Sequence, residues 1–389
     1  EPATFVIYRI LGNDLPPRHE VGQTIANTRF ILEHEPPLAQ CQKRWILNRI
    51  VDPAVERDLH GLLADAGQPV LRIPFRLDEY AEQALDLGPL AFAGPTTPRR
   101  GPTPGPSPAA LAAAFRLKNL YAMNNNAARN LAIEDGRARA TWVLPFDGGV
   151  FVTERAWEGL RAAVEDRPDL PYVVVPMSRA LANTDVLAGQ MPLPAGEEPQ
   201  VGFRFESGLR FEVQQPYGRR PKVELLWRLG VGGPWQDWRR EPWDRPFPGP
   251  SQDHGRFQVA GSVIRLAAGS GVGPVTGTAG RSARVATRDA AIVDFLQAID
   301  AQLSNREWAS RDLAYYDEDV LEEMVSGRFE AGAAIIVAAA RTVMLRAPGA
   351  VPPVGRARHW ALFSDLAALG LAWRITRESG FAARGVDAV

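Results

Sequence analysis

The stretch NNNAARNLAIEDGRARATWVLPFDGG, residues 124–149, decides how this chain can fold. It predicts a helix, a turn and a buried strand over residues 140–146, after which Asp147 is followed by two glycines. In α/β sheets, ligands bind beyond the carboxyl ends of the strands. Asp147 is therefore a candidate functional group as well as a candidate turn residue.

The segments before this stretch repeat the alternation of strand and helix. Short apolar runs predict buried strands over residues 5–11 (FVIYRIL), 44–52 and 69–75. Helices are predicted between them, over residues 24–35 and 53–67. Connections of this kind require parallel strands with right-handed crossovers, so we expect a doubly wound α/β fold with a mostly parallel sheet.

The later segments have a different character. Residues 94–108 are dense in Pro and Gly and predict a surface insertion. From about residue 200 the sequence alternates like an antiparallel hairpin (201–214), and a long irregular segment rich in Trp, Arg, Gly and Pro follows. We expect one domain over residues 1–300 and a mostly helical C-terminal extension over 305–389.

Composition excludes several classes of protein. The 389 residues are 46% hydrophobic and carry a net charge of −1, which is typical neither of a disordered chain nor of a nucleic-acid binder. Cys41 is the only cysteine, so it cannot form an intrachain disulfide and is expected to pack rather than react. The longest apolar run, 331–345, contains Arg341 and is shorter than the roughly 20 residues of a membrane span. We see no signal peptide and expect a cytoplasmic protein, but a chain that starts without Met also fits a removed leader.

The helix that carries Ala128-Arg129-Asn130 and the strand that ends in Asp147 resemble the nucleotide-binding half of GT-A fold glycosyltransferases. The similarity is to the inverting, family-2-like group typified by processive and bacterial polysaccharide synthases, and it covers roughly residues 4–180. Residues 200–300 match an antiparallel acceptor side only in general layout. The resemblance implies transfer of a sugar from a nucleotide-diphospho sugar to a carbohydrate or glycosylated acceptor, as in polysaccharide biosynthesis.

The chemistry of this reaction explains the residue types. A nucleoside diphosphate leaving group develops negative charge that must be neutralised. The resemblance implies that Asp147 holds a divalent cation, Mn²⁺ or Mg²⁺. However, Asp-Gly-Gly replaces the Asp-x-Asp motif of the family, so the second acid is missing. An acid from elsewhere, a metal bound through water, or replacement of the metal by Arg129, Lys118 and Lys222 remain open.

Other candidate donor-binding residues lie near the predicted strand ends and in a later basic segment. The loop after the first strand and the end of the second strand are where the fold implied by the resemblance contacts base and ribose. Arg9 lies inside an apolar strand and needs a partner, such as Asp52 or Asp147, unless it faces the site. The full expected donor-binding set is Arg9, Asn13, Asp14, Asn48, Asp52, Lys118, Arg129, Asn130, Arg219, Arg220 and Lys222.

Two aspartates are candidates for the catalytic base. Asp237 lies between Trp235 and Trp238, where aromatic faces can stack on sugar rings and a carboxylate can accept the proton of an acceptor hydroxyl. Asp253 is the alternative, and the adjacent His254 could serve as a further metal ligand.

Two other functions stay open at this point. A degenerate domain that binds a nucleotide sugar or glycan without turnover would account for the missing second acid. A sugar nucleotidyltransferase shares the layout, but it requires a glycine-rich basic loop that Gly12–His19 matches poorly. The expected partners are a nucleotide-sugar donor and a carbohydrate acceptor, with no nucleic acid and no transmembrane segment.

Overall fold

The computed structural model describes residues 3–91, 107–188, 197–236, 240–267 and 277–304, and short pieces at 336–338, 340–341, 344, 368–373 and 375–381. The chain divides into two compact units, Glu1–Gln83 with Arg116–Asp300, and Ala84–Phe115 with Ala301–Val389. This division groups residues 84–115 with the C-terminal region, whereas the sequence predicted them inside a 1–300 domain. Residues 94–106 of the predicted insertion and most of 305–389 lie outside the described residues, and the described pieces after 336 are mostly helical.

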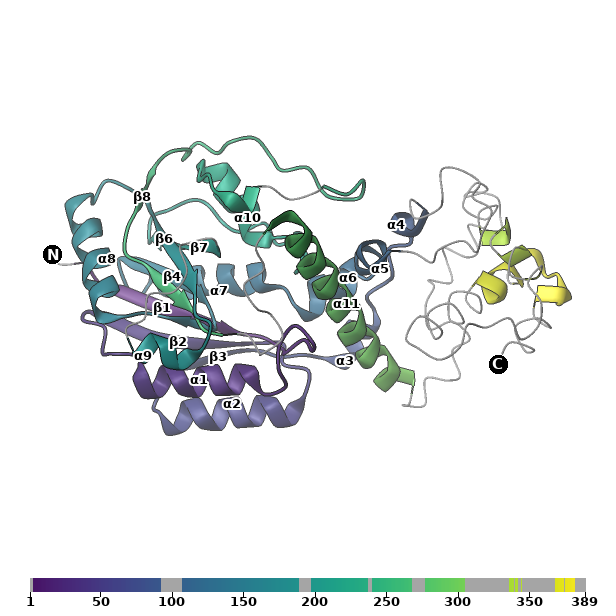
Figure 1. Ribbon diagram of the computed structural model, residues 1–389, viewed down its shortest axis with the longest axis horizontal. Coiled ribbons are helices and arrows are strands. Elements are labelled where there is room, and N and C mark those ends of the chain that lie inside the picture. The colour runs from purple at the N-terminus through teal and green to yellow at the C-terminus, as the bar shows by residue number, and fades with distance from the viewer. Residues whose placement is uncertain are drawn as a thin grey trace. The chain divides into compact units, whose positions relative to one another are not determined.

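The first unit is built on a mixed sheet with a parallel half. Within the described ranges, nine strands are ordered β3-β2-β1-β4-β7-β6-β9-β5, and β8 pairs with β6. Strands β1 (Phe5–Leu11), β2 (Cys41–Asn48) and β3 (Val70–Ile73) run parallel, and β4 (Trp142–Asp147) lies parallel to β1 on its other side (Figure 1). The order therefore reverses between β1 and β4, which is the point where doubly wound sheets bind ligands.

The second half of the sheet is mixed. Strand β7 (Glu197–Arg204) runs antiparallel to both β4 and β6 (Tyr172–Arg179). Strands β8 (Phe257–Val259) and β9 (Val263–Arg265) run parallel to β6, and β5 (Val150–Phe151) runs antiparallel to β9. This is a mixed α/β fold with a mostly parallel sheet, as the sequence predicted.

The predicted hairpin over residues 201–214 was wrong. The residues after Arg204 form no second strand, and β7 instead pairs with two strands distant in sequence. Residues 199–203 of β7 are all buried, and the strand lies between β4 and β6 in the sheet, so the alternation read from the sequence does not mark the solvent-facing side of a hairpin.

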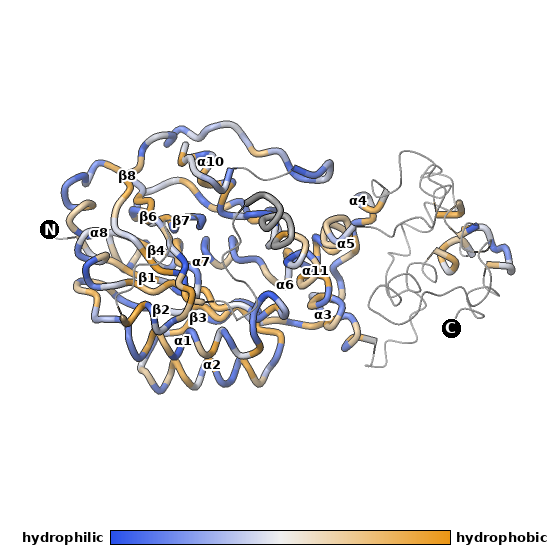
Figure 2. Tube along the Cα trace, viewed as in Figure 1, coloured by the Kyte–Doolittle hydropathy of each residue, from blue (hydrophilic) through white to orange (hydrophobic). Residues whose placement is uncertain are grey.

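Helices cover both faces of the parallel half. On one face, α1 (Gln23–His34) and α2 (Pro53–Asp65) lie side by side and bury apolar residues against β1 and β2 (Figure 1). On the other face, α7 (Asn125–Arg137) packs Ala128 and Ala132 against Val6, Tyr8 and Val143. Figure 2 shows hydrophobic and hydrophilic residues alternating along α1 and α2, as expected for helices with one buried side.

The sequence signals at helix ends are confirmed. Helix α2 begins at Pro53, and α8 (Glu154–Asp166) begins after Thr153, whose hydroxyl accepts from the Ala156 N–H at 3.3 Å. The remaining helices described before residue 305 are α3 (Leu77–Ala81), α4 (Gly88–Ala91), α5 (Pro108–Ala114), α6 (Arg116–Ala122), α9 (Asn183–Leu187), α10 (Pro221–Leu229) and α11 (Gly277–Ser304), with a 3₁₀ turn, η1, over Pro234–Gln236.

Two expectations about individual segments can be compared with the described residues. Cys41 opens β2, and burial raises the pKa of its thiol to about 12, which suits a packing residue. No described helix combines the length and the apolar character that crossing a bilayer requires.

The two glycines after Asp147 have different surroundings. A Cβ on Gly148 would lie 2.6 Å from the carbonyl oxygen of Ile10 and 2.7 Å from a methyl of Leu11, whereas a Cβ on Gly149 would meet nothing closer than 3.7 Å. The close approach of β1 therefore requires glycine at 148 but not at 149.

This difference yields a matched pair of variants. Gly148→Ala should lower the free energy of unfolding by about 1–3 kcal/mol, because the new methyl overpacks the contact with β1. Gly149→Ala should change it by less than about 0.5 kcal/mol. Urea denaturation of the full chain measures both, and equal losses in the two variants would contradict the packing explanation.

Candidate functional site

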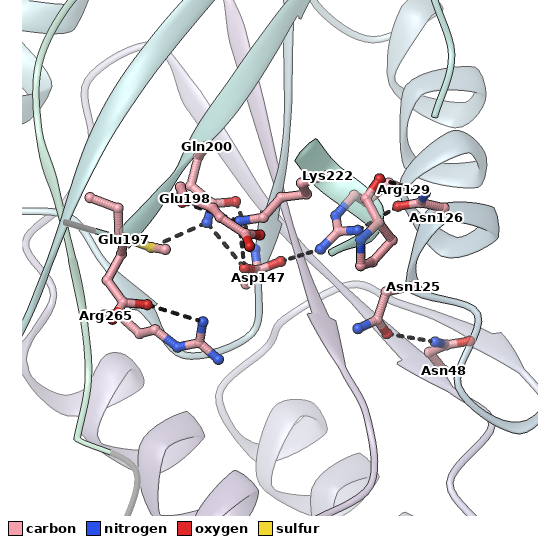
Figure 3. A network of polar contacts seen from close by, with 12 residues as sticks. Asn48, Asn125, Asn126, Arg129, Asp147, Glu197, Glu198, Gln200, Lys222 and Arg265 are labelled. Carbon is pink, nitrogen blue, oxygen red and sulfur yellow. Dashed lines mark hydrogen bonds and ion pairs between the residues drawn. The ribbon is translucent and has the colours of Figure 1, made fainter. Parts of the chain in front are cut away.

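Asp147 is the centre of a polar network at the carboxyl end of β4 (Figure 3). Its Oδ1 accepts a hydrogen bond from Arg129 Nη2 at 2.6 Å, and its Oδ2 accepts from Lys222 Nζ at 3.0 Å and from Gln200 Nε2 at 3.1 Å. Its backbone N–H donates to Gln200 Oε1 at 3.3 Å. One carboxylate thus joins β4 to α7, β7 and α10.

This network is a buried ion pair with two cations. The side chains of Arg129 and Lys222 are 4% and 6% exposed, and that of Asp147 is 21% exposed. Burial opposes the charge on Asp147, but Lys222, Arg129 and the more distant Arg265 hold the pKa of its carboxyl well below its usual range. Burial lowers the pKa of Lys222, and Asp147 opposes that change. Each charge in the group is retained because its partners are present.

The local sequence explains why both cations reach the same carboxylate. Arg129 Nη1 donates to Asn126 Oδ1, one turn earlier on α7, at 2.6 Å. The Asn126 amide in turn donates to the carbonyl oxygens of Glu212 at 2.8 Å and Pro221 at 3.1 Å. Since Pro221 is the first residue of α10, Asn126 fixes the start of that helix, and with it the position of Lys222, relative to Arg129.

Two further arginines lie beside this group. Arg179 and Arg265 are register partners on the neighbouring parallel strands β6 and β9. Both contact Glu197: Arg179 makes hydrogen bonds of 2.9 and 3.0 Å, and Arg265 Nη1 lies 3.9 Å from Glu197 Oε2. Their side chains are 25% and 26% exposed, so neither arginine is completely enclosed by the protein.

Arg18, in the loop after β1, completes what we call the arginine cluster (Arg18, Arg179 and Arg265). Its guanidinium lies 5.7 Å from the Tyr217 ring. Burial lowers the pKa of Arg18, and it is close enough to Arg265 for that charge to lower it further. Burial and all three arginines also lower the pKa of His19 to about 3. His19 is therefore a neutral imidazole in a cationic environment.

The predicted donor-binding residues of the first loop have structural partners. Asn13 donates to the Arg49 carbonyl and accepts from the Val51 N–H, both at 2.8 Å. Asp14 accepts from the Thr24 N–H at 3.1 Å and from its hydroxyl at 2.6 Å, near the start of α1. The carboxylate of Asp14 thus occupies the end of α1 where an anionic ligand would otherwise bind.

Arg9 and Asp52 also contact structural partners. Arg9 is fully buried and pairs with Glu35 at the end of α1, not with Asp52 or Asp147, while its Nε donates to the Val150 carbonyl at 3.2 Å. Asp52 caps α2 and accepts from the Ala54 N–H at 2.8 Å. Neither belongs to the network around Asp147.

Lys118 and Asn130 lie outside that network as well. Lys118 Nζ pairs with Asp300 Oδ1 at 2.6 Å and lies 4.9 Å from the Tyr80 ring. The Asn130 amide exchanges two 2.9 Å hydrogen bonds with the backbone of Phe211. Of the cations proposed to replace a metal, the structure brings Arg129 and Lys222 to Asp147 but not Lys118.

The three basic residues around the start of α10 also differ in whether they contact Asp147. Arg219 forms a two-pronged ion pair with Asp244, and Arg220 donates to the Trp235 carbonyl. Arg220 adopts a left-handed conformation (φ 52°) directly before Pro221. Of the three basic residues predicted here, Lys222 alone contacts Asp147 through a hydrogen bond that the structure describes.

Of the two candidate catalytic bases, the structure describes Asp253 but not Asp237. Asp253 accepts from the Tyr172 hydroxyl at 2.8 Å and from Arg256 at 2.9 Å. Tyr172 begins β6, which runs in the same direction as β4, so Asp253 lies at the amino edge of the sheet and Asp147 at the carboxyl edge. This position separates Asp253 from the network. Asp237 lies outside the described residues.

The carboxyl end of β2 carries buried polar atoms that lack partners. Asn48 is 1% exposed and donates to Asn125 Oδ1 at 3.2 Å, but its own Oδ1 accepts no hydrogen bond. Arg49 has a left-handed backbone (φ 49°), lies 5.0 Å from the Tyr121 ring, and has an unpaired Nε and Nη1. Such atoms suit a polar ligand at this edge.

Several residues of the site were missed by sequence reasoning. Gln200 and Glu197 come from β7, whose pairing with β4 and β6 no local pattern reveals. Arg18 belongs to the first-loop segment that the sequence singled out, but the arginine itself carried no distinguishing signal. Arg179 and Arg265 are the last residues of β6 and β9, and that position is the signal that could have identified them.

An aromatic groove lies on α10 and the segment after it. The residues that line it are Val223, Trp227, Val231, Trp235, Gln236, Arg240 and Phe247. Trp227 is 43% exposed, and the indole N–H of Trp235 is buried without a partner. A flat exposed ring and an unused donor are groups that can bind a sugar face and a sugar hydroxyl.

The residues around Asp147 do not fit a divalent cation. Among the described side chains, no group of three His, Cys, Asp or Glu residues is arranged to hold a metal. Both oxygens of Asp147 already accept from Arg129, Lys222 or Gln200, and a metal there would face their positive charges. The same donors fit an anion placed beside Asp147.

Comparison with known proteins adds little to this geometry. No protein-family model matches the chain, and no curated protein matches it either. Among solved structures, it is similar to the mannosyltransferase PcManGT from Pyrobaculum calidifontis in complex with GDP-Man and Mn²⁺, with a TM-score of 0.31 and 11% identity over 97% of this chain and 88% of that one. A similarity this distant carries no argument, so the proposals below rest on the chain's own residues.

The state of His19 predicts a pH dependence. An unfolded histidine titrates near pH 6.5, whereas the pKa of folded His19 is lowered to about 3. Protons therefore bind the unfolded chain first, and the free energy of unfolding should fall as the pH falls from about 6.5 toward 3. His19→Asn keeps an acceptor for the Leu15 N–H, which lies 3.1 Å from Nδ1, and should reduce this loss.

Urea denaturation at pH 7.5 and pH 4.5 measures the effect. The exposed His34 gives the control variant His34→Asn, which should keep the pH dependence of the wild-type protein. If His19→Asn lost as much stability on acidification as the wild-type protein, His19 would not be held neutral.

Proposed function

We propose that this chain is a glycosyltransferase that transfers a sugar from a nucleotide-diphospho sugar to a carbohydrate or glycosylated acceptor. The observation that carries the proposal is the excess of cations around Asp147 at the carboxyl edge of an α/β sheet. A diphosphate leaving group needs such charge as its bond to the sugar breaks. The resemblance of the Ala128-Arg129-Asn130 helix and the strand ending in Asp147 supports the GT-A class.

In the proposed reaction, Arg129 and Lys222 stabilise the departing diphosphate. Both are nearly buried, so their charges act in a medium less polarisable than water. Asp147 keeps Lys222 charged and holds both cations in place before the donor binds. The ion pair thereby takes the role that a divalent cation has in many transferases of this kind, and no step requires a metal at Asp147.

The nucleoside and the acceptor occupy different sides of Asp147 in this proposal. Asn48 and Arg49, with unpaired polar atoms at the end of β2, are proposed to contact the base or ribose. The aromatic groove of Trp227 and Trp235 is proposed for the acceptor. Asp237, one residue beyond η1, is the proposed general base, because Asp253 lies at the opposite edge of the sheet from Asp147.

The two alternatives differ in what supports them. The pairing of Asp147 with cations also fits a module that binds a nucleotide sugar without turnover, and an activity assay separates that module from an enzyme. A sugar nucleotidyltransferase is less well supported, because Asp14 rather than a basic loop occupies the start of α1.

Donor binding is tested by thermal denaturation of the full chain with UDP, GDP, ADP, CDP and dTDP, each in EDTA and each with Mn²⁺. One diphosphate should raise the melting temperature in EDTA, since binding at a hundredfold excess over Kd stabilises the native state by about 2.7 kcal/mol. Lys222→Met should remove most of that shift, because it deletes a charge at the diphosphate.

The control variant is Arg167→Met, which changes an exposed arginine paired with Asp169 and should keep the shift. A shift that requires Mn²⁺, or that survives in Lys222→Met, would contradict the assignment of the cations. Release of that diphosphate from its sugar nucleotides, stimulated by a glycan, then distinguishes a transferase from a binding module; no release with any glycan acceptor favours the module.

A further inference from the structure

We infer that the substrate carries, in addition to its diphosphate, an acidic group on the sugar side that the arginine cluster of Arg18, Arg179 and Arg265 binds. This inference rests on the proposed function and adds to it the chemical class of the sugar. The group is a carboxylate or a phosphate, carried either by the donor sugar or by the acceptor.

The pairing of the arginine cluster is the first observation. Arg179 and Arg265 stand side by side on β6 and β9, where two like charges repel, and they share one carboxylate, that of Glu197. Arg179 takes both oxygens of Glu197 at 2.9–3.0 Å, so Arg265, at 3.9 Å, is left with only a long contact to it. Two partly exposed guanidinium groups held together in this way form a fork for an oxyanion.

The balance of charge is the second observation. Among the described residues, Arg129 and Lys222 exceed Asp147 by one charge, and the arginine cluster exceeds Glu197 by two. Arg288 is opposed by both Asp289 and Glu198 and adds no further positive charge. The excess at the arginine cluster is therefore local, and a diphosphate placed beside Asp147 does not supply the cluster with an acid of its own unless the substrate brings one.

The place of the cluster is the third observation. In Figure 3, Arg265 and Glu197 lie on one side of Asp147, and Asn48 and Asn125 lie on the other. The second side is the carboxyl end of β2, in the parallel half where the nucleoside is proposed to bind. With the nucleoside at the end of β2 and the diphosphate beside Asp147, the sugar is placed on the side of the cluster.

The state of His19 agrees with this arrangement. Burial and the charges of the three arginines lower the pKa of His19 and keep its imidazole neutral, although Glu197 lies among those arginines. An anion bound among these arginines would reduce the local positive potential. The pKa of His19 should therefore rise when an acidic ligand binds, and NMR of the ring can follow that change.

Titration calorimetry of the full chain tests the inference. One arm compares UDP-glucose with UDP-glucuronate and GDP-mannose with GDP-mannuronate. The other compares glucose with glucose 6-phosphate and glucuronate, each added to protein saturated with the preferred nucleoside diphosphate. In one arm, the acidic ligand should bind at least about tenfold tighter than its neutral counterpart. The arm that shows the preference identifies the donor or the acceptor as the source.

Arg265→Gln should abolish the preference and leave the affinity for the nucleoside diphosphate within about threefold. Arg18→Gln is the second variant: Arg18 comes from the loop after β1, and its loss leaves the hydrogen bonds between Arg179 and Glu197 in place, so this variant should fold even if the first does not. Arg256→Gln removes an exposed arginine paired with Asp253 and is the matched control.

The outcomes separate this inference from the proposed function. If neutral and acidic ligands bind equally, or if both cluster variants keep the preference, the inference is overturned and the glycosyltransferase proposal stands. If nucleoside diphosphates do not bind but glucuronate or glucose 6-phosphate binds in a manner lost in Arg18→Gln, the anion site stands and the proposed function fails. If none of these ligands binds, both are overturned.

Discussion

The ion pairs of Asp147 with Arg129 and Lys222 are the interaction on which the rest of the site depends. They tie the end of a central strand to α7 and α10, two helices that begin almost a hundred residues apart in the sequence. Charges this deeply buried are stable only with their partners, so the pairs also define which conformation of the α10 segment is compatible with a folded site. The position of Lys222 follows from that of Asn126, which bonds to the Pro221 carbonyl.

The same pairs change what a lone aspartate at a strand end means. A carboxylate that already pairs with two cations is a poor metal ligand, but it keeps those cations charged and oriented for an anion. Gly148 is explained by packing against β1, whereas the surroundings of Gly149 would accept a Cβ. The Asp-Gly-Gly sequence is then consistent with a site that relies on Arg and Lys instead of a metal ion.

The sequence predicted the features that local patterns determine, and it did not predict those that depend on contacts between distant segments. The parallel strands and their helices follow from local periodicity and capping, and Thr153 and Pro53 marked helix starts correctly. The pairing of β7 between β4 and β6 was beyond such signals, and with it the contribution of Gln200. Polar residues at strand ends were equally ambiguous, because an aspartate that caps a helix, such as Asp52, looks the same in sequence as one that binds a ligand.

A double-mutant cycle tests the central claim most directly. The free energies of unfolding of the wild-type protein, Asp147→Asn, Lys222→Met and the double variant would be measured by urea denaturation. A buried pair whose members depend on each other predicts a coupling energy of about 1–3 kcal/mol. The double variant should then lose less free energy of unfolding than the sum of the losses in the two single variants. A coupling energy near zero would contradict the account, since Asp147 and Lys222 would then not hold each other in place.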